Sequence, residues 1–156
     1  MTDPAELVGP GEAFEEFYRR ELGRQVRRAA LILGDDTAAN DVVHDAFTTL
    51  FARWGSVTEP GPYLQRMVLN GCRDQARRTR RLRRLLPRLA ASASAQPSEI
   101  LWDVLAGLPF NQRAAVVLRY YESLPEAEIA AVLDCPTGSV GPWITRGLAT
   151  MRKALQ

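Results

Sequence analysis

Apolar residues recur at steps of three and four positions through most of this 156-residue chain, and no other feature constrains its fold as strongly. Side chains at these steps fall on one face of an α-helix, whereas a half-buried β-strand requires alternation of apolar and polar residues. The helical period is found in residues 12–33, 38–54, 62–86, 98–105, 110–121, 125–133 and 137–155. No stretch has a convincing strand pattern. The sequence therefore predicts an all-α protein.

A basic run and a polar stretch divide the chain into two parts. Residues 73–88 contain eight arginines and one aspartate, a net charge of +7, and because the whole chain carries +2 the rest carries −5. Pro87 is expected to end the helix that holds this run. The small and polar residues that follow are typical of a flexible linker. We therefore predict two small helical domains, 10–86 and 98–156, joined by a linker over 87–97.

The sequence also excludes several classes of function. No apolar run approaches the length of about 18 residues that a membrane span needs, and no secretory signal begins the chain, so we expect a cytoplasmic protein without membrane insertion. The distant Cys72 and Cys135 and the single His44 form no plausible zinc site, and both thiols are expected to be buried and reduced. Phosphate-binding glycine loops, paired catalytic carboxylates and a nucleophile beside His44 are missing. We expect no metal, no cofactor and no enzyme.

The helix predicted over 62–86 has one apolar face and one strongly basic face. Its polar side gathers Asn70, Arg73, Asp74, Arg77 and Arg78 at steps of three and four. Arginine and asparagine side chains grip phosphates and read base edges. An ion pair from Asp74 is expected to hold Arg77 or Arg78 in place. This pattern favours a nucleic-acid-binding helix, and the alternative is a solvated basic surface.

The C-terminal residues have the pattern of a helix-turn-helix motif. Pro125 begins a short helix, residues 134–136 form the turn, and Thr137 is expected to cap a longer helix that reaches about Leu155. In this motif the second helix enters the major groove of duplex DNA. The alternative is a plain structural corner between two helices.

Three sequence motifs follow one another along the chain. The first is Asp41-Val42-Val43-His44-Asp45-Ala46-Phe47 with Leu50 and Trp54, and the second is Pro62-Tyr63-Leu64 with Asn70, Asp74, Arg77 and Arg78. The third begins with Leu108-Pro109 and ends with Gly138-Ser139-Val140. In this order they resemble the core-binding helix, the promoter-melting helix and the C-terminal promoter-binding domain of bacterial RNA polymerase sigma factors of the extracytoplasmic-function (ECF) group. The resemblance covers residues 12–155, and the Arg and Ala bias points to the actinobacterial branch.

The resemblance implies a transcription initiation factor with a sigma-2-like and a sigma-4-like domain, which binds core RNA polymerase and promoter DNA. The first domain would bind the polymerase β′ coiled coil through Asp41, Asp45, Phe47, Leu50 and Trp54. It would capture the melted minus-ten element through Ser56, Tyr63, Asn70, Arg73, Arg77 and Arg78. The second domain would bind the β flap and read the minus-35 element with Ser139, Val140, Trp143 and Arg146. An anti-sigma factor is a common further partner in the family.

The sequence departs from the family pattern after Val140. Basic and small residues are usual there, whereas this chain has Gly141-Pro142-Trp143. Pro142 removes a backbone donor and can kink the helix. We therefore expect weak or unusual binding to the minus-35 element, with Trp143 in contact with a thymine methyl group or a sugar. The alternative is that Trp143 packs against its own domain or against a partner.

Two other classes of protein are compatible with parts of this sequence. One is a helix-turn-helix regulator that binds duplex DNA without core polymerase. Such regulators are usually dimers, and this chain has no obvious dimerisation segment. The other is a helical interaction module whose arginines meet RNA or acidic partners. The module would need neither the spacing of Asn70, Asp74 and Arg77 nor the C-terminal helix pair.

Overall fold

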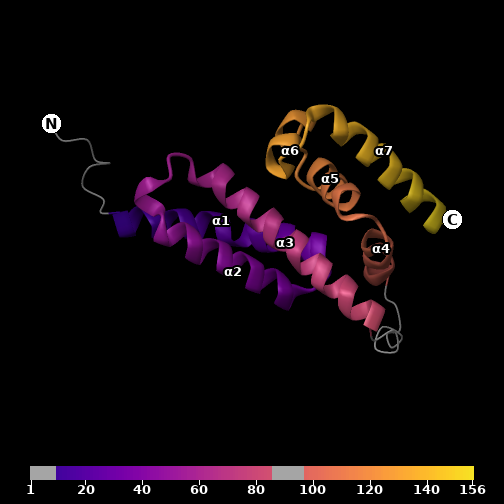
Figure 1. Cartoon of the computed structure of the whole chain (residues 1–156), viewed down its shortest axis with the longest axis horizontal. Coiled ribbons are helices and arrows are strands. Elements are labelled where there is room, and N and C mark those ends of the chain that lie inside the picture. Colours follow the sequence, from indigo (N-terminus) through magenta and orange to yellow (C-terminus); the bar gives the residue numbers. More distant parts are fainter. Residues whose placement is uncertain (1–9, 86–96) are drawn as a thin grey trace.

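The computed structural model describes residues 10–85 and 97–156, and in these residues the chain is helical throughout its regular structure (Figure 1). In order the helices are α1 (Pro10–Leu33), α2 (Asp36–Ala52), the 3-10 helix η2 (Trp54–Ser56), α3 (Pro60–Leu85), α4 (Pro97–Ala106), α5 (Phe110–Tyr120), α6 (Glu126–Leu133) and α7 (Thr137–Ala154). The prediction of an all-α fold is confirmed. The predicted linker over 87–97 lies outside the described residues, apart from Pro97, which already belongs to α4.

The turn between α1 and α2 is made by Gly34 and Asp35. Gly34 has φ +72°, a left-handed conformation that glycine adopts without a steric penalty, and its N–H donates to the carbonyl of Ala30 at 2.8 Å. Asp35 has an extended backbone, and its carboxylate accepts from the N–H of Ala38 at 3.1 Å. This turn folds α2 back along α1.

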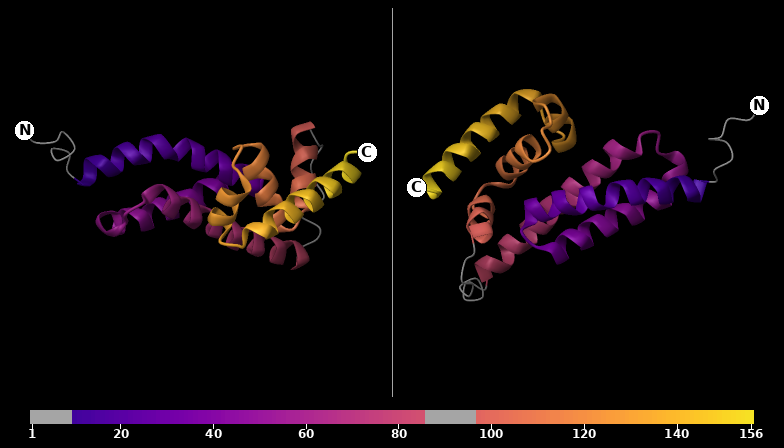
Figure 2. Two further views of the ribbon diagram at one scale, coloured as in Figure 1. Left: turned by 90° about the horizontal axis from the view of Figure 1, so that it is seen from above. Right: turned by 180° about the vertical axis from the view of Figure 1, so that it is seen from behind.

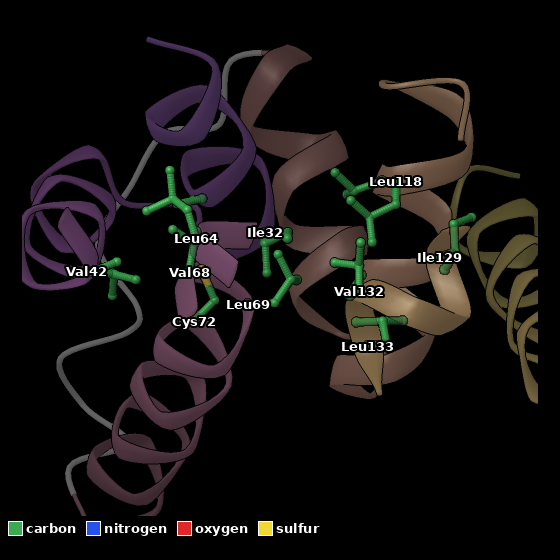
Figure 3. Packing of buried hydrophobic residues seen from close by; sticks show 14 of the residues in the cluster. Ile32, Val42, Leu64, Val68, Leu69, Cys72, Leu118, Ile129, Val132 and Leu133 are labelled. Carbon is green, nitrogen blue, oxygen red and sulfur yellow. The ribbon is translucent and has the colours of Figure 1, made fainter. Parts of the chain in front are cut away.

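Helix α3 packs against both α1 and α2 through its apolar face. Leu64, Val68, Leu69 and Cys72 are fully or almost fully buried. Figure 3 shows Val42 of α2 on the side of α3 that carries Val68 and Cys72. A methyl group added at Gly71 would lie 2.7 Å from Cγ1 of Val42, so α2 and α3 approach closely only because residue 71 is glycine. The opposite face of α3 is thereby left for solvent or for a partner.

The C-terminal part is organised around α5, whose residues Ala114–Leu118 are all buried. Helices α6 and α7 both pack on it, and they meet at a tight turn. Asp134 takes the left-handed conformation at the end of α6, with φ +53°, and the N–H of Cys135 donates to the carbonyl of Ala130 at 3.0 Å. This geometry is the predicted helix-turn-helix.

Two details of α7 differ from the expectation. Pro136 takes the cap position, and its carbonyl accepts from the N–H of Ser139 at 3.0 Å. Thr137 is the first helical residue and no side chain caps this end, so the prediction that Thr137 caps α7 was wrong. Pro142 lies inside α7, and the helix continues beyond it to Ala154.

The two parts of the chain lie against each other rather than apart. Helix α5 contacts α1, and α6 contacts α3, and Figure 2 shows the two groups of helices from above and from behind. One apolar cluster runs through both parts, and in the close-up Ile32 and Leu69 lie opposite Leu118 and Val132 (Figure 3). Among residues 10–85 and 97–156, every helix is too short or too polar to serve as a membrane span.

Candidate nucleic-acid and polymerase interface

The outer face of α3 carries a row of exposed arginines. These are Arg77, Arg78, Arg80, Arg81 and Arg84. Among the described residues, none of these five arginines forms an ion pair. Asn70 is exposed on the same helix, less than two turns before Arg77. A row of unneutralised guanidinium groups attracts a polyanion such as nucleic acid.

The predicted ion pair between Asp74 and Arg77 or Arg78 is not formed. All three side chains are exposed to solvent. An exposed ion pair contributes less than about 1 kcal/mol to stability, and its formation costs the conformational entropy of two side chains. That prediction was therefore wrong, and both arginines are left available to an outside partner.

Arg73 lies in a different environment from its neighbours. It is half-buried, and its guanidinium carbon lies 5.3 Å from the ring centroid of Phe110. Its Nη2 donates to Oδ1 of Asn111 at 3.4 Å. Both partners belong to α5, so this predicted minus-ten residue is engaged by the second domain.

The turn between α2 and α3 is organised by Arg53, which is not among the residues predicted from the sequence. The carbonyl of Arg53 accepts from Oγ of Ser56 at 2.9 Å, and its Nη1 donates to the hydroxyl of Tyr63 at 3.5 Å. Ser56 is exposed and Tyr63 is half-buried against the core. The structure thus brings together Ser56 and Tyr63, which both belong to the predicted minus-ten set. Their common partner, Arg53, carries no signal in the sequence because it is not one of the apolar residues that mark the helical period.

Helix α2 separates the predicted polymerase-binding residues into two groups. Asp41 and Asp45 are exposed, whereas Phe47 and Leu50 are buried in the core. Phe51, an apolar residue of the same helix, is 59% exposed. It lies at the edge of the buried stripe, and its ring centroid is 4.9 Å from that of Phe14. The outward face of α2 therefore presents two carboxylates and an aromatic ring.

Trp54 closes the end of this aromatic group. Its ring centroid lies 5.2 Å from that of Phe14 and 5.4 Å from that of Phe17, and the side chain is half-buried. Edge-to-face arrangements at this separation are favourable contacts between aromatic rings. Trp54 therefore holds η2 against α1.

Helix α7 also divides its predicted residues between core and surface. Val140 is buried, Ser139 and Trp143 are half-buried, and Trp143 packs against the apolar core. Arg146 is exposed, and Pro142 and Thr145 are exposed beside it. The first half of α7 thus offers one cation and a small polar group to a DNA groove.

The two thiols differ in burial. Cys72 is buried, and burial raises the pKa of its thiol to about 12. Cys135 is only half-buried, so the prediction of two buried thiols was right for Cys72 and wrong for Cys135. Burial also raises the pKa of Cys135. Within the described residues, no group of three His, Cys, Asp or Glu side chains is arranged to hold a metal ion.

Comparison with known proteins matches both parts of the chain. The family model for Sigma-70 region 2 matches residues 17–82, and the model for Sigma-70 region 4 matches residues 98–151. An RNA polymerase sigma-E factor of Streptomyces coelicolor is 30% identical, over 91% of this chain and 85% of the relative. The ECF RNA polymerase sigma factor SigM of Mycobacterium tuberculosis is 28% identical, over 97% of this chain and 81% of the relative.

Two solved structures have a similar fold. CnrH, in complex with the cytosolic domain of CnrY, matches with a TM-score of 0.66 and 28% identity, over 93% of this chain and 88% of that chain. The sigma factor RpoE from Bartonella quintana, in complex with the anti-sigma factor NepR, matches with a TM-score of 0.72 over 92% of this chain and 97% of that chain. The second likeness has 17% identity and concerns the fold alone.

Proposed function

Because the chain belongs to the family of ECF RNA polymerase sigma factors, we propose that residues 10–86 bind core polymerase and the minus-ten element, and that residues 98–156 bind the minus-35 element. As a member of this family the protein is a transcription initiation factor that binds core RNA polymerase and directs it to promoters. The match to Sigma-70 region 2 over residues 17–82 favours this function over a regulator that works without core polymerase.

The polymerase contact is proposed to be the outward face of α2. Asp41, Asp45 and the exposed ring of Phe51 would meet the β′ coiled coil. Phe47 and Leu50 would support this face from within the core. Among residues 10–85 and 97–156, no side chain forms an ion pair with Asp41 or Asp45, and such carboxylates suit a basic surface on the polymerase.

The minus-ten contact is proposed to be the exposed face of α3 and the turn before it. Arg77 and Arg78 would hold phosphates, and Asn70 would contact a base. An unstacked base also needs an aromatic surface, which Tyr63 would supply beside Ser56. The observation that carries the proposal is the exposed Asn70 on the same face as arginines that form no ion pair within the described part of the chain.

The minus-35 contact is proposed to be the first half of α7, with Ser139 and Arg146 facing DNA. Val140 would hold the helix in place from the core. The single cation in this region supports weak binding, and the packing of Trp143 against the core favours a structural role for that residue.

The proposed function also implies a location in the cell and further partners of the protein. We place the protein in the cytoplasm, where the polymerase performs the catalysis and this chain contributes none. An anti-sigma partner is proposed from membership of the family, and the similar chain CnrH is likewise found in complex with a second protein, the cytosolic domain of CnrY. The β flap would be the site of the second domain on the polymerase.

The test is initiation by the reconstituted holoenzyme. The purified chain is mixed with core polymerase and a library of promoter fragments, and the 5′ ends of transcripts are mapped. Transcripts from defined sites support the sigma function. Tight binding to duplex DNA without core polymerase supports the regulator, and absence of both supports the interaction module.

A further inference from the structure

The turn that joins α2 to α3 carries an arginine, Arg53, whose guanidinium has few partners in its own chain. Arg53 is exposed, and within residues 10–85 and 97–156 it forms no ion pair. In the same residues its side chain makes one hydrogen bond, from Nη1 to the hydroxyl of Tyr63 at 3.5 Å, which is longer than most such bonds. A guanidinium has five N–H donors, so most of its binding capacity is available to an outside group.

The main chain of Arg53 fixes the place from which this side chain extends. Its N–H donates to the carbonyl of Leu50 at 3.0 Å, and its carbonyl accepts from both the N–H and Oγ of Ser56 at 2.9 Å. Residue 53 thus ends α2 and begins η2. Because these bonds use only main-chain atoms of Arg53, they remain when its side chain is replaced. The function of the guanidinium can therefore be tested without removing the turn.

Tyr63 is the aromatic residue of this turn that is available for stacking. The other candidate, Trp54, contacts Phe14 and Phe17 with 5.2 and 5.4 Å between ring centroids, and its ring is used to hold η2 against α1. Tyr63 packs against the core but is only half-buried. A methyl group added at Gly55 would meet no atom within 4 Å, so the turn is open to solvent. An unpaired base can stack on an aromatic ring in such a place.

Tyr63 also begins a row of residues along the outer face of α3. Asn70 follows after seven residues and Arg77 after seven more, and both are exposed. Seven residues are close to two helical turns, so these side chains lie along one stripe with steps of about 10.5 Å. Asp74, on the same face, adds a negative charge between Asn70 and Arg77. A DNA strand along this stripe would meet a cation at Arg77, whereas the phosphate beside Tyr63 needs a cation from outside the stripe.

The arginines in the first two thirds of α3 do not supply this cation. Arg66 lines a groove between α3 and α6 together with Glu128. Arg73 is held by Phe110 of α5. Arg53, which reaches Tyr63 from the end of α2, is therefore the arginine placed to bind a phosphate at this end of the stripe.

We propose that Arg53 is a further DNA-binding residue, whose guanidinium holds the phosphate of the nucleotide that stacks on Tyr63, an inference that rests on the proposed function. The forked guanidinium donates two parallel hydrogen bonds to phosphate oxygens. The contact with the hydroxyl of Tyr63 orients it toward the stacked nucleotide. Base and phosphate of one nucleotide are then held together. In a duplex the base is stacked inside the helix, so this pair of residues selects single-stranded DNA.

The first test measures the affinity of the full chain for a fluorescent single-stranded oligonucleotide of mixed sequence at several salt concentrations. Arg53→Ala should lower the slope of log affinity against log salt by about 0.7, the value for one single-strand phosphate, which is about a fivefold loss of affinity at about 0.1 M salt. Arg53→Lys keeps the charge and should keep the slope. Tyr63→Phe keeps the ring, loses the hydroxyl and should also keep the slope. Arg20→Ala, which removes an exposed arginine of α1, is the matched control.

The second test identifies the phosphate in the complete complex. The holoenzyme is bound to a promoter fragment mapped by the initiation assay, and phosphates of the non-template strand are replaced one at a time by uncharged methylphosphonate. At one position the replacement should weaken open-complex formation by the wild type about fivefold and should have no further effect on Arg53→Ala. This non-additivity shows that the residue and the phosphate act in the same contact, which a purely structural effect of residue 53 would not produce.

Each outcome decides for or against the proposal. An unchanged salt slope in folded Arg53→Ala overturns it, and so does an equal decrease in Arg20→Ala or with duplex DNA of the same sequence. A slope that falls as much in Arg53→Lys or Tyr63→Phe assigns the effect to the structure of the turn and overturns the phosphate contact. Additive losses at every methylphosphonate position do the same. If Arg53→Ala lowers the slope but even the wild type fails to initiate with core polymerase, the proposed function fails while the single-strand contact stands.

Discussion

Asn70 and Arg73 lie one turn apart on α3 and have different surroundings. Asn70 is exposed, whereas Arg73 is held by α5. We expect Asn70→Ala to reduce specific promoter opening about tenfold or more, because a base-specific contact is worth about 1–3 kcal/mol. Core binding should be unchanged, since the proposed polymerase contact is on α2. Run-off transcription and core titration measure the two effects separately, and an equal loss in both contradicts the assignment of Asn70 to DNA.

The two cysteines should differ in reactivity. Burial raises the pKa of Cys72 to about 12 and also raises that of the half-buried Cys135. A raised pKa keeps a thiol protonated at neutral pH, and the reactive thiolate forms only as the pH approaches that pKa. A disulfide reagent at about pH 8 should modify Cys135 slowly and Cys72 only after unfolding. Cys135→Ser should abolish the reaction of the folded protein, and persistence of the reaction means that Cys72 is accessible.

Arg28 shows why the domain interface was not predicted from the sequence. Its partner Glu122 is 94 positions away, and nothing local connects the two residues. A signal was nevertheless present in α1. Gln25, Arg28, Ala29 and Ile32 share one face at helical steps, and all four are buried. Polar residues that share a helix face with core residues indicate that a polar partner covers this face. They do not identify the partner.

At the scale of elements, the packing of α2 on α3 depends on glycine at position 71. We expect Gly71→Ala to lower the free energy of unfolding by about 1–3 kcal/mol, because the added methyl would overlap Val42. The control is Gly61→Ala, which lies in the same helix with no atom within 4 Å of the added group and should be neutral or stabilising. Thermal melting measures both variants. An equal response of the two contradicts the close approach, and Val42→Ala should restore part of the loss in Gly71→Ala.

The arginine row of α3 should strengthen binding to DNA without contributing to sequence specificity. Replacing Arg80 and Arg81 by alanine should reduce the slope of log affinity for single-stranded DNA against log salt by about 0.7 for each phosphate that the variant no longer neutralises. The control is Arg20→Ala, an exposed arginine on α1 rather than on α3. Fluorescence anisotropy at several salt concentrations gives the slopes. A salt slope that changes in Arg20→Ala as much as in the double variant would show that the attraction is not local to α3.

The helices themselves were predictable, because each buries one apolar face and the spacing of apolar residues in the sequence indicates this face directly. Capping at Asp35 was also predictable, since acceptor and donor are neighbours in sequence. The cap of α7 was not, because Pro136 and Thr137 both suit a helix start and only the backbone distinguishes them. Among the predicted site residues, Asp41 and Asn70 are exposed, whereas Phe47 is buried and Arg73 is half-buried. Such differences depend on neighbouring helices, which a single-helix pattern does not contain.

At the scale of the whole molecule, the central property is how strongly the two domains are coupled to each other. The proposed function uses two domains, whereas the structure joins these domains through a shared apolar cluster and the buried ion pair of Arg28 and Glu122. A buried ion pair adds little net stability compared with apolar packing, but it strongly penalises partial separation. The chain should therefore behave as a single cooperative unit, although its sequence is organised as two domains.

This cooperativity can be measured by calorimetry. We expect the wild-type chain to unfold in one transition, with equal calorimetric and van't Hoff enthalpies, because the two domains share one core. Glu122→Gln should separate the unfolding into two overlapping transitions, since it leaves the charge of Arg28 buried without its partner at the contact between the domains. Glu15→Gln, which removes an exposed ion pair with Arg19 within α1, should keep the single transition. Two transitions in the wild type would mean that the Arg28–Glu122 pair does not couple the domains, and a single transition in every variant would mean that apolar contacts alone hold them together.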